Sequence, residues 1–311
     1  MKDKGIKLLK SYKGFDCELV TDLSRENLLL KLPEFDGITL RRGKIDREIL
    51  NKCDKLKVIA RHGVGYDSVD TVSLKEKGIT LLVAHNSTST SPAEHIMFMI
   101  MNIYKGVSMF DTMVRNGDFV KAIHLNIEQN FELFDKTVLI AGFGRIGKKL
   151  IKKCLGFDMK VIVFDPYVDD KVIASFGGKK VSNLEDALKV ADILSLSLPL
   201  NSETKNFITL REMKLMKKSS VIINAARGGV VNEVDLNNAL NNNIIAFAGI
   251  DVFEKEPPEL TNPLLTNKKV VLSPHAATFT KEGLESMAVE TAQNIIDFFE
   301  NKIESTKIVK L

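Results

Sequence analysis

The sequence is poor in cysteine and in net charge, and both shortages exclude classes of protein. Its three cysteines, Cys17, Cys53 and Cys154, lie far apart along 311 residues. This number and spacing fit neither a disulfide framework nor a zinc site, so we expect no metal and a reducing, cytoplasmic setting. The formal net charge of +4 is small for this length, and the lysines are scattered among acidic residues. We therefore expect no nucleic-acid partner.

Long apolar runs are missing as well. The most apolar run, residues 96–103, is far too short to cross a bilayer, and the first residues contain no apolar segment of the signal-peptide type. We expect neither a membrane segment nor a secretory signal. Hydrophobic residues make up 44% of the chain and charged residues 27%, which is typical of a soluble globular protein. The length favours two ordinary domains over one very large domain.

One stretch carries a strong pattern, in which a strand is followed by spaced glycines and a helix. Residues 137–141 are apolar and partly β-branched, which predicts a buried strand. Residues 142–147 read Gly-Phe-Gly-Arg-Ile-Gly, and the residues after them repeat apolar side chains at helical spacing. A second apolar segment, residues 161–164, ends at Asp165. This order of elements is typical of a dinucleotide-binding unit.

Each part of this unit has a physical task in binding a dinucleotide. Gly142 permits a tight turn, Gly144 lets the backbone approach a pyrophosphate, and Gly147 lets the helix pack closely on the strand. The helix N-terminus presents free N–H groups and a partial positive charge to the phosphates. Asp165 lies where a ribose-binding carboxylate is expected, and it would repel a 2′-phosphate, so we predict NAD as the cofactor. The alternative for Asp165 is a turn at the strand end before Pro166.

Strands and helices alternate in the first part of the chain. We expect short strands there at residues 6–9, 18–20, 37–40, 57–60 and 80–83. Amphipathic segments lie between them, such as residues 24–32 and 46–53. This alternation is typical of a parallel sheet, so we expect a small α/β domain.

A helix is expected after these strands, with Ser91 as its N-cap and Pro92 at its first position. It continues toward Arg115, and its apolar faces are wide for a surface helix. Such a helix is either buried in the core or shared with a second subunit.

The second half of the chain predicts a doubly wound domain, from about Ala93 to His275. We expect further strands at residues 192–198, 220–224, 245–250 and 270–272. Ser182 and Glu185 have the spacing of a capping box at a helix start. A last helix is expected at residues 285–301.

Three polar residues follow predicted strands of this domain. Arg227, Glu256 and His275 should share the edge at which the carboxyl ends of parallel strands meet, beside the glycine loop. An arginine binds a substrate carboxylate bidentately, and a histidine held by a carboxylate transfers a proton, which suits reduction of a ketone. Singly, Arg227 could cap a turn and His275 could be an ordinary turn residue. In the first domain, Gly63 and Gly65 follow a strand and predict either a ligand loop or an ordinary turn.

With these residues in place, the chain resembles the D-isomer-specific 2-hydroxyacid dehydrogenases, within them the phosphoglycerate dehydrogenase and hydroxypyruvate reductase branch. The resemblance covers essentially the whole chain. Its most specific stretches are residues 61–70, 137–165, 196–204, 224–231, 251–258 and 273–278. It implies an α/β fold in which residues 93–279 form a doubly wound Rossmann domain that binds NAD. Residues 1–92 and 280–311 would form a smaller, flavodoxin-like substrate domain split across both chain ends.

The resemblance also implies residue roles. Arg227, Glu256 and His275 would be the catalytic triad, with His275 as the acid in reduction and the base in oxidation. Val64 and Gly65 would hold the substrate carboxylate through backbone N–H groups, together with Arg227. The positions that line the NAD site in this family correspond here to Gly142, Gly144, Arg145, Ile146, Gly147, Asp165, Pro199, Thr204, Ala225, Arg227, Asp251 and His275. Asp251 would hold the carboxamide.

The function that this resemblance implies is an NAD-dependent D-2-hydroxyacid dehydrogenase of the phosphoglycerate dehydrogenase type. The family also implies a cytoplasmic homodimer built on the nucleotide domains, with a cleft that closes between domains. Alternatives are a hydroxypyruvate or glyoxylate reductase, and an NAD(H)-sensing, corepressor-like binding protein. Ala276 and Ala277 replace a larger apolar residue and glycines that are usual after the histidine. Basic residues that could face a phosphorylated substrate are Arg41, Arg42, Lys44 and Arg61.

Overall fold

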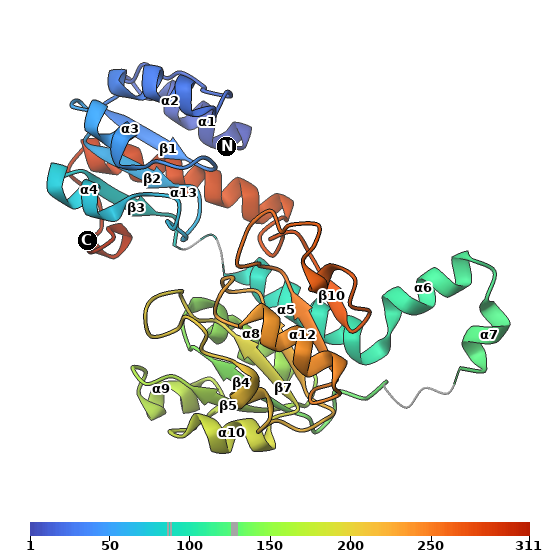
Figure 1. Ribbon diagram of the computed structural model, residues 1–311. Helices are drawn as coiled ribbons and strands as arrows, with labels where there is room; N and C mark the ends of the chain where they lie inside the picture. Colours follow the sequence, from blue (N-terminus) through green and yellow to red (C-terminus); the bar gives the residue numbers. More distant parts are fainter. Residues whose placement is uncertain (86, 88, 126–129) are drawn as a thin grey trace. The chain divides into compact units, whose positions relative to one another are not determined.

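Two parallel sheets organise the chain (Figure 1). The computed structural model describes residues 1–85, 87, 89–125 and 130–311. The chain divides into two units, of which unit 1 comprises Met1–Ser89 and Thr278–Leu311 and unit 2 comprises Thr90–Ala277. Both units alternate strands with helices, so the prediction of an α/β protein with two domains is confirmed.

The sheet of unit 2 has seven parallel strands in the order β10-β9-β8-β7-β4-β5-β6. The strands are β4 (Thr137–Ala141), β5 (Lys160–Phe164), β6 (Lys179–Lys180), β7 (Ile193–Leu196), β8 (Val221–Asn224), β9 (Phe247–Ile250) and β10 (Val270–Leu272). The chain runs outward from β4 to β6 and then returns to β7 on the other side of β4. The strand order therefore reverses between β4 and β7, where a ligand crevice forms in open parallel sheets.

Both faces of this sheet are covered by helices. The helices of unit 2 are α5 (Thr90–Lys105), α6 (Val107–Arg115), α7 (Phe119–Ile123), α8 (Arg145–Leu155), α9 (Asp170–Ser175), α10 (Leu184–Val190), α11 (Leu210–Met213), α12 (Glu233–Asn241) and the 3-10 helix η3 (Pro263–Leu265). Among them, α6 buries no residue and projects away from the sheet (Figure 1). Successive side chains of β4 point to opposite faces, because Val138 and Ile140 pack in one core cluster and Leu139 and Ala141 in the other. Burial on both sides explains why these strands are continuous apolar runs.

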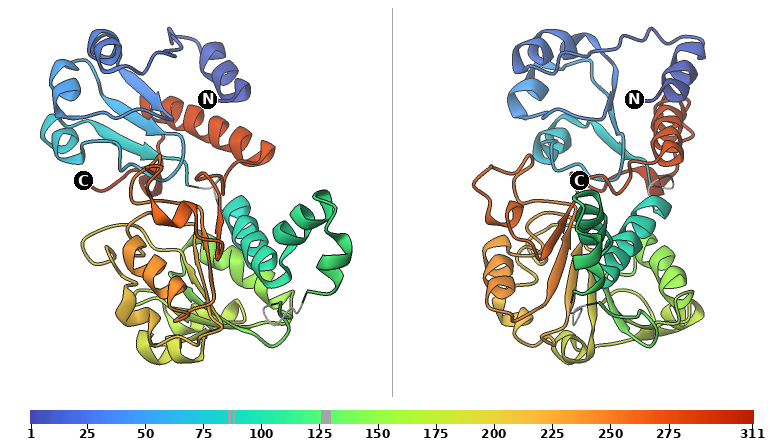
Figure 2. Two further views of the ribbon diagram at one scale, coloured as in Figure 1. Left: turned by 45° about the vertical axis from the view of Figure 1, so that its right-hand side comes forward. Right: turned by 90° about the vertical axis from the view of Figure 1, so that its right-hand side faces the viewer.

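Unit 1 is built on three parallel strands, β1 (Gly37–Leu40), β2 (Val58–Arg61) and β3 (Thr80–Val83), in that order. Its helices are α1 (Asp3–Ser11), α2 (Arg25–Lys31), α3 (Arg47–Lys52), α4 (Thr71–Lys77), α13 (Lys281–Phe299) and the 3-10 helices η1 (Leu32–Glu34) and η4 (Ser305–Lys307). Helices α1 and α13 cover one face of the sheet, and α2, α3 and α4 cover the other (Figure 2).

Two strand predictions in unit 1 are wrong. Residues 6–9 belong to α1, and no strand forms at residues 18–20. A short apolar run does not distinguish a strand from a helix, and here the partner decides, because Gly5 and Leu9 turn one helical face toward α13. Leu19 is exposed, so residues 18–20 bury no alternate side chains, and β1 bonds to β2 alone among the described strands.

Two helix starts also differ from expectation. Helix α5 begins at Thr90, so Ser91 lies inside it, and Pro92 still falls in the first turn, where a missing N–H is tolerated. The N-cap of α10 is Asn183 rather than Ser182, because the Asn183 side chain accepts the N–H of Asp186 at 3.2 Å. The helix expected to reach Arg115 is interrupted at Gly106, whose φ of +61° ends α5 and starts α6.

The packing of α1 on α13 yields the first prediction. A Cβ added at Gly5 would lie 2.3 Å from the carbonyl oxygen of Ala288, and that backbone cannot move aside cheaply. We expect Gly5→Ala to lower the free energy of unfolding by about 1–3 kcal/mol, measured by urea denaturation. The control is Gly156→Ala, where the nearest atom would be a carbonyl oxygen at 3.4 Å. Equal stability of the two variants would contradict the packing.

Candidate active site

The glycine loop after β4 has the geometry of a dinucleotide cradle. Gly142 has a φ of +96°, and a Cβ there would come within 2.6 Å of the carbonyl oxygen of Ser197. A Cβ at Gly147 would come within 2.5 Å of the carbonyl oxygen of Gly142, so α8 packs directly on the turn. A Cβ at Gly144 would meet nothing within 4 Å, which leaves open space beside its backbone. The loop therefore fits a pyrophosphate at Gly144.

The N-terminus of α8 adds electrostatic attraction for an anion at this loop. Gly144 is the N-cap and has no side chain to accept the first N–H groups of the helix. Arg145 and Ile146 occupy the first turn, whose N–H groups carry the positive end of the helix dipole. The residues present thus suit the phosphates of NAD.

Asp165 joins the end of β5 to the glycine loop. Its carboxylate accepts the N–H groups of Phe143 at 2.7 Å, Tyr167 at 2.9 Å and Val168 at 3.1 Å. Both the turn and the cofactor interpretation of Asp165 fit these bonds, because a carboxylate has about four lone-pair positions and still has room for a ribose hydroxyl.

The loop after β7 closes on itself. The hydroxyl of Thr204 donates to the carbonyl oxygen of Pro199 at 2.6 Å and accepts the N–H of Asn201 at 2.9 Å. Both Pro199 and Thr204 therefore belong to a preformed turn at the carboxyl end of the sheet. The same loop lies beside the glycine loop, because the carbonyl oxygen of Ser197 packs against Gly142.

The turn after β8 carries Ala225 and Arg227. The side-chain amide of Asn224 donates to the carbonyl oxygen of Arg227 at 2.9 Å, and Arg227 Nη1 donates to the carbonyl oxygen of Ala226 at 2.7 Å. A Cβ at Gly228 would come within 1.9 Å of the carbonyl oxygen of Phe253, so this turn is pressed against the turn after β9. The half-buried Arg227 is thereby held at the sheet edge.

His275 and Glu256 form the pair that the sequence predicted. His275 Nδ1 lies 2.8 Å from Glu256 Oε2, and Glu256 Oε1 accepts the N–H of Phe253 at 3.1 Å. The hydrogen bond to Glu256 outweighs the effect of burial and raises the pKa of His275 above its usual value. Burial favours the neutral form of Glu256, but the hydrogen bond from His275, its charge and the N–H of Phe253 together outweigh burial and lower the pKa of that carboxyl. The imidazolium form is thus favoured.

Asp251 lies behind this pair and is fully buried. Sequence reasoning placed Asp251 in the site but missed two of its neighbours, Ser273 and His95. His95 Nε2 is 2.9 Å from Ser273 Oγ, which donates to Asp251 Oδ1. No spacing rule marks His95, since it lies in the first turns of α5, far along the chain from β9 and β10.

The predicted substrate loop, with Val64 and Gly65, belongs to unit 1. Arg61 ends β2 and donates from Nε to the carbonyl oxygen of Gly65 at 2.7 Å. Its Nη1 donates to the carbonyl oxygens of Leu40 at 3.0 Å and Arg41 at 3.3 Å. Arg61 therefore joins this loop to the end of β1.

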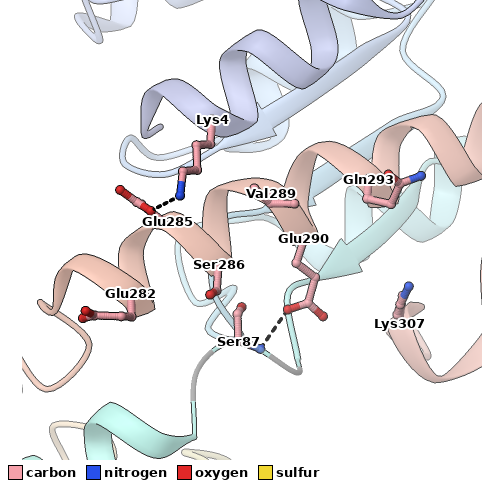
Figure 3. A pocket seen from close by; sticks show the side chains of 9 residues that line it. All are labelled: Lys4, Ser87, Glu282, Glu285, Ser286, Val289, Glu290, Gln293 and Lys307. Carbon is pink, nitrogen blue, oxygen red and sulfur yellow. Dashed lines mark hydrogen bonds and ion pairs between the residues drawn. The ribbon is translucent and has the colours of Figure 1, made fainter.

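Unit 1 also has a pocket of about 670 Å³ on one side of α13, shown in Figure 3. Lys4 pairs with Glu285 there, and the N–H of Ser87 donates to Glu290 at 2.9 Å. No predicted site residue lines this pocket, so it lends no support to the candidate site. Within the described part of the chain, no cluster of three or more His, Cys, Asp or Glu could hold a metal ion. The same residues include no helix of the length and apolarity that a membrane span requires.

Comparison with known proteins points to one family. The family model described as D-isomer specific 2-hydroxyacid dehydrogenase, NAD binding domain, matches residues 97–277. The chain is 34% identical over 296 residues to the D-3-phosphoglycerate dehydrogenase of Methanocaldococcus jannaschii, covering 95% of this chain and 55% of that protein. It is 35% identical over 315 residues to the glyoxylate reductase of Thermococcus litoralis, covering 99% of this chain and 94% of that protein.

Solved structures agree with this family. The structure of D-2-hydroxyisocaproate dehydrogenase superposes with a TM-score of 0.83 at 26% identity, covering 99% of this chain and 97% of that chain. The chain spans about half the length of the curated phosphoglycerate dehydrogenases that it matches.

The His275–Glu256 pair yields the second prediction. Replacing Glu256 by Gln removes the negative charge that raises the pKa of His275 and leaves only a weaker, neutral hydrogen bond, while burial and Arg227, which lower the pKa, remain. We expect the pKa of His275 to fall in Glu256→Gln, measured by NMR titration of the five histidines. The control is Glu254→Gln, since Glu254 bonds to the N–H of Glu233 instead. An unchanged titration in Glu256→Gln would contradict the pairing.

Proposed function

The chain belongs to the D-isomer specific 2-hydroxyacid dehydrogenase family, and on that basis we propose that it transfers hydride between NAD(H) and a 2-hydroxy or 2-keto acid. The observation that carries the proposal is the pair of His275 and Glu256, 2.8 Å apart, on the same sheet edge as the glycine loop. A histidine that holds its proton beside a carboxylate is suited to protonate a ketone oxygen.

The cofactor supplies or accepts the hydride when it is bound. Gly144 and the first turn of α8, with Arg145 and Ile146, would hold its phosphates, because their backbone faces open space and carries partial positive charge. Asp165 would accept the ribose 2′-hydroxyl and disfavour a 2′-phosphate. Pro199, Thr204, Ala225 and Asp251 would complete the NAD site, with Asp251 toward the carboxamide.

The proposed triad divides the work at the substrate. Glu256 occupies Nδ1 of His275, so Nε2 is the ring atom left to give a proton in reduction or take one in oxidation. Arg227 would hold the carboxylate and keto oxygen of the substrate. Val64 and Gly65 would supply backbone N–H groups to the same carboxylate, on a loop that Arg61 holds through Gly65. We propose residues 1–92 and 280–311 as the substrate domain and residues 93–279 as the NAD domain, which the division at residues 89 and 278 supports.

The substrate that we propose first is a phosphorylated acid of the phosphoglycerate type. The exposed side chains of Arg41, Arg42 and Lys44 support it, since they follow β1 and join the Arg61 loop through the carbonyl of Arg41. Glyoxylate or hydroxypyruvate is the second candidate. It is supported by the 35% identity to a glyoxylate reductase over 315 residues. A corepressor-like protein that binds NAD(H) without turnover is the non-enzymatic alternative.

The third prediction tests the activity itself. The assay is NADH oxidation with phosphohydroxypyruvate, hydroxypyruvate, glyoxylate, pyruvate and 2-ketobutyrate, with NADPH as the cofactor control. We expect His275→Gln and Arg227→Ala to lower kcat/KM about 10²–10⁴-fold on the preferred acid while NADH still binds, because both residues act on the substrate. A wild-type protein that binds NADH but turns over none of these acids would support the binding-protein alternative.

The same assay has a pH dependence of known sign. Reduction needs protonated His275 and oxidation needs it neutral. Reduction should be fully active at low pH and fall as pH rises through the His275 pKa, which Glu256 holds above the ordinary value of about 6.5. Oxidation should rise over the same interval. Parallel profiles in the two directions would contradict the role of His275.

Apolar side chains exposed on α5, α6 and α7 support a homodimer through the NAD domains. Helix α6 has no buried residue, although helices of a monomer normally bury one face. The ribbon shows α6 projecting away from the sheet of unit 2 (Figure 1). The exposed apolar residues of this surface are Phe98, Met101, Val107, Met109, Val114, Phe119, Val120 and Ile123. Exposed apolar side chains on successive helices are typical of a subunit contact. A cytoplasmic setting also stays a proposal, supported by three free cysteines.

The fourth prediction tests this surface. Phe98 is 58% exposed, and a carboxylate in its place would be buried without a partner in a dimer. We expect Phe98→Glu to change a dimer into a monomer, measured by light scattering of the eluted protein. The control is Val234→Glu on α12, where the apolar side chain is 75% exposed outside this surface. A dimer that persists in Phe98→Glu would exclude this surface as the interface.

A further inference from the structure

The turn that carries His275 is held by Asp251 from behind. The carbonyl oxygen of Asp251 accepts the N–H of His275 at 2.7 Å. Its carboxylate accepts the N–H of Ala276 at 2.7 Å and of Ala277 at 3.1 Å. His275 has a φ of +51°, in the left-handed region that few residues with a side chain adopt. Asp251 therefore holds the backbone of the turn on which His275 lies.

The carboxylate of Asp251 is fully buried and stays ionised. Burial by itself would raise its pKa, but the hydrogen bonds from His95, Ser273 and the N–H of Ala276 outweigh burial and lower the pKa. If this buried carboxylate lost one donor, the cost of its desolvation would be offset less well and its ionised form would be less stable. The position of the turn at residues 273–277 thus depends on the hydrogen-bond donors that stabilise the Asp251 carboxylate.

The number of protons available in the hydrogen bonds among His95, Ser273 and Asp251 makes His95 a donor. An ionised carboxylate only accepts, so the single hydroxyl proton of Ser273 goes to Asp251. Ser273 Oγ must then accept from His95 Nε2, 2.9 Å away, so Nε2 carries a proton whether or not the ring is charged. His95 Nε2 also lies 3.5 Å from Asp251 Oδ1 and is 17% exposed, which shelters both contacts from water.

We propose that His95 is a positioning residue for His275. Through Ser273 and Asp251, its Nε2–H fixes the turn at residues 273–277 so that His275 Nδ1 meets Glu256. His95 touches no reacting atom in this scheme, and its place in the reaction rests on the proposed catalytic role of His275. The structural link from α5 to the turn does not depend on that role.

The fifth prediction compares two substitutions of His95. Glutamine places an amide N–H near the position of Nε2, and phenylalanine keeps a ring of similar shape without a donor. The first measurement is the pKa of His275 by NMR titration, which needs no substrate. Charged groups that face His275 are Glu256, Asp251 and Arg227. We expect the pKa of His275 to fall in His95→Phe, because its bond to Glu256 forms in a smaller fraction of molecules, and to stay at the wild-type value in His95→Gln.

The direction in which the pKa of His275 changes distinguishes a positioning role of His95 from a purely electrostatic effect of its charge. If His95 acted only as a nearby positive charge, its removal in either variant would raise the pKa of His275. A fall in His95→Phe alone therefore identifies the hydrogen bond as the cause. Ser273→Ala breaks the same link from its other side and should lower the pKa in the same way, so it decides the question if His95→Phe does not fold.

The second measurement is steady-state kinetics on the preferred acid. We expect kcat to fall about tenfold or more in His95→Phe and Ser273→Ala, and the Kd for NADH to change less than kcat does, because the glycine loop that would hold the phosphates is not disturbed. His95→Gln should keep kcat within about threefold of wild type. The double variant His95→Phe/Ser273→Ala should be no worse than either single one, since both break one chain of contacts.

Two results would overturn the proposal. One is wild-type kcat and an unchanged His275 pKa in both His95→Phe and Ser273→Ala. The other is a His95→Gln protein that is folded and yet as impaired as His95→Phe, which would mean that the donor is not what matters. If wild type turns over no acid, the proposed function fails, and the titration of His275 still decides the role of His95.

Discussion

All seven strands of unit 2 run in the same direction, and this constraint decides where its polar groups gather. Each strand ends at one edge of the sheet, so residues from distant parts of the chain, such as Asp165 and His275, follow strand ends on that same edge. The reversal of strand order between β4 and β7 then leaves room at that edge for a ligand. The His275–Glu256 pair depends on this arrangement, because its two residues follow different strands of the sheet, 19 positions apart in sequence.

Loops at strand ends have backbone groups that no strand neighbour satisfies, and charged side chains satisfy them here. Asp165 accepts the N–H of Phe143 in the glycine loop, and Asp251 accepts those of Ala276 and Ala277. In unit 1, Arg61 supplies donors to the carbonyl oxygens of Leu40 and Gly65. Each charged residue thus fixes a loop before any ligand arrives, which lowers the entropy that binding must remove. Asp165 and Asp251, which the sequence suggested as ligand contacts, therefore also stabilise the loops by accepting their backbone N–H groups.

The two units differ in which parts of the chain cover the faces of their sheets. The sheet of unit 2 is covered on both faces, yet α6 in the same unit buries none of its residues. Among the described residues, the sheet of unit 1 has three strands, and α13, from the far end of the chain, covers one of its faces. The end of the chain is therefore part of the core of unit 1, and close contacts such as Gly5 with Ala288 follow from it.

Local patterns in the sequence were sufficient for the unit β4–α8–β5, because a strand, a glycine turn, a helix and Asp165 lie within about thirty residues and each follows from its own residue types. They were also sufficient for β1, β2, β3 and the strands after β6, and hence for placing Arg227, Glu256 and His275 at strand ends. Only tertiary structure made residues 6–9 a helix, because the deciding partner is α13. It also brought His95 to Ser273, 178 positions away in sequence. A hydrogen bond across that separation is specified by the packing of α5 near β10, and no spacing along the chain encodes it.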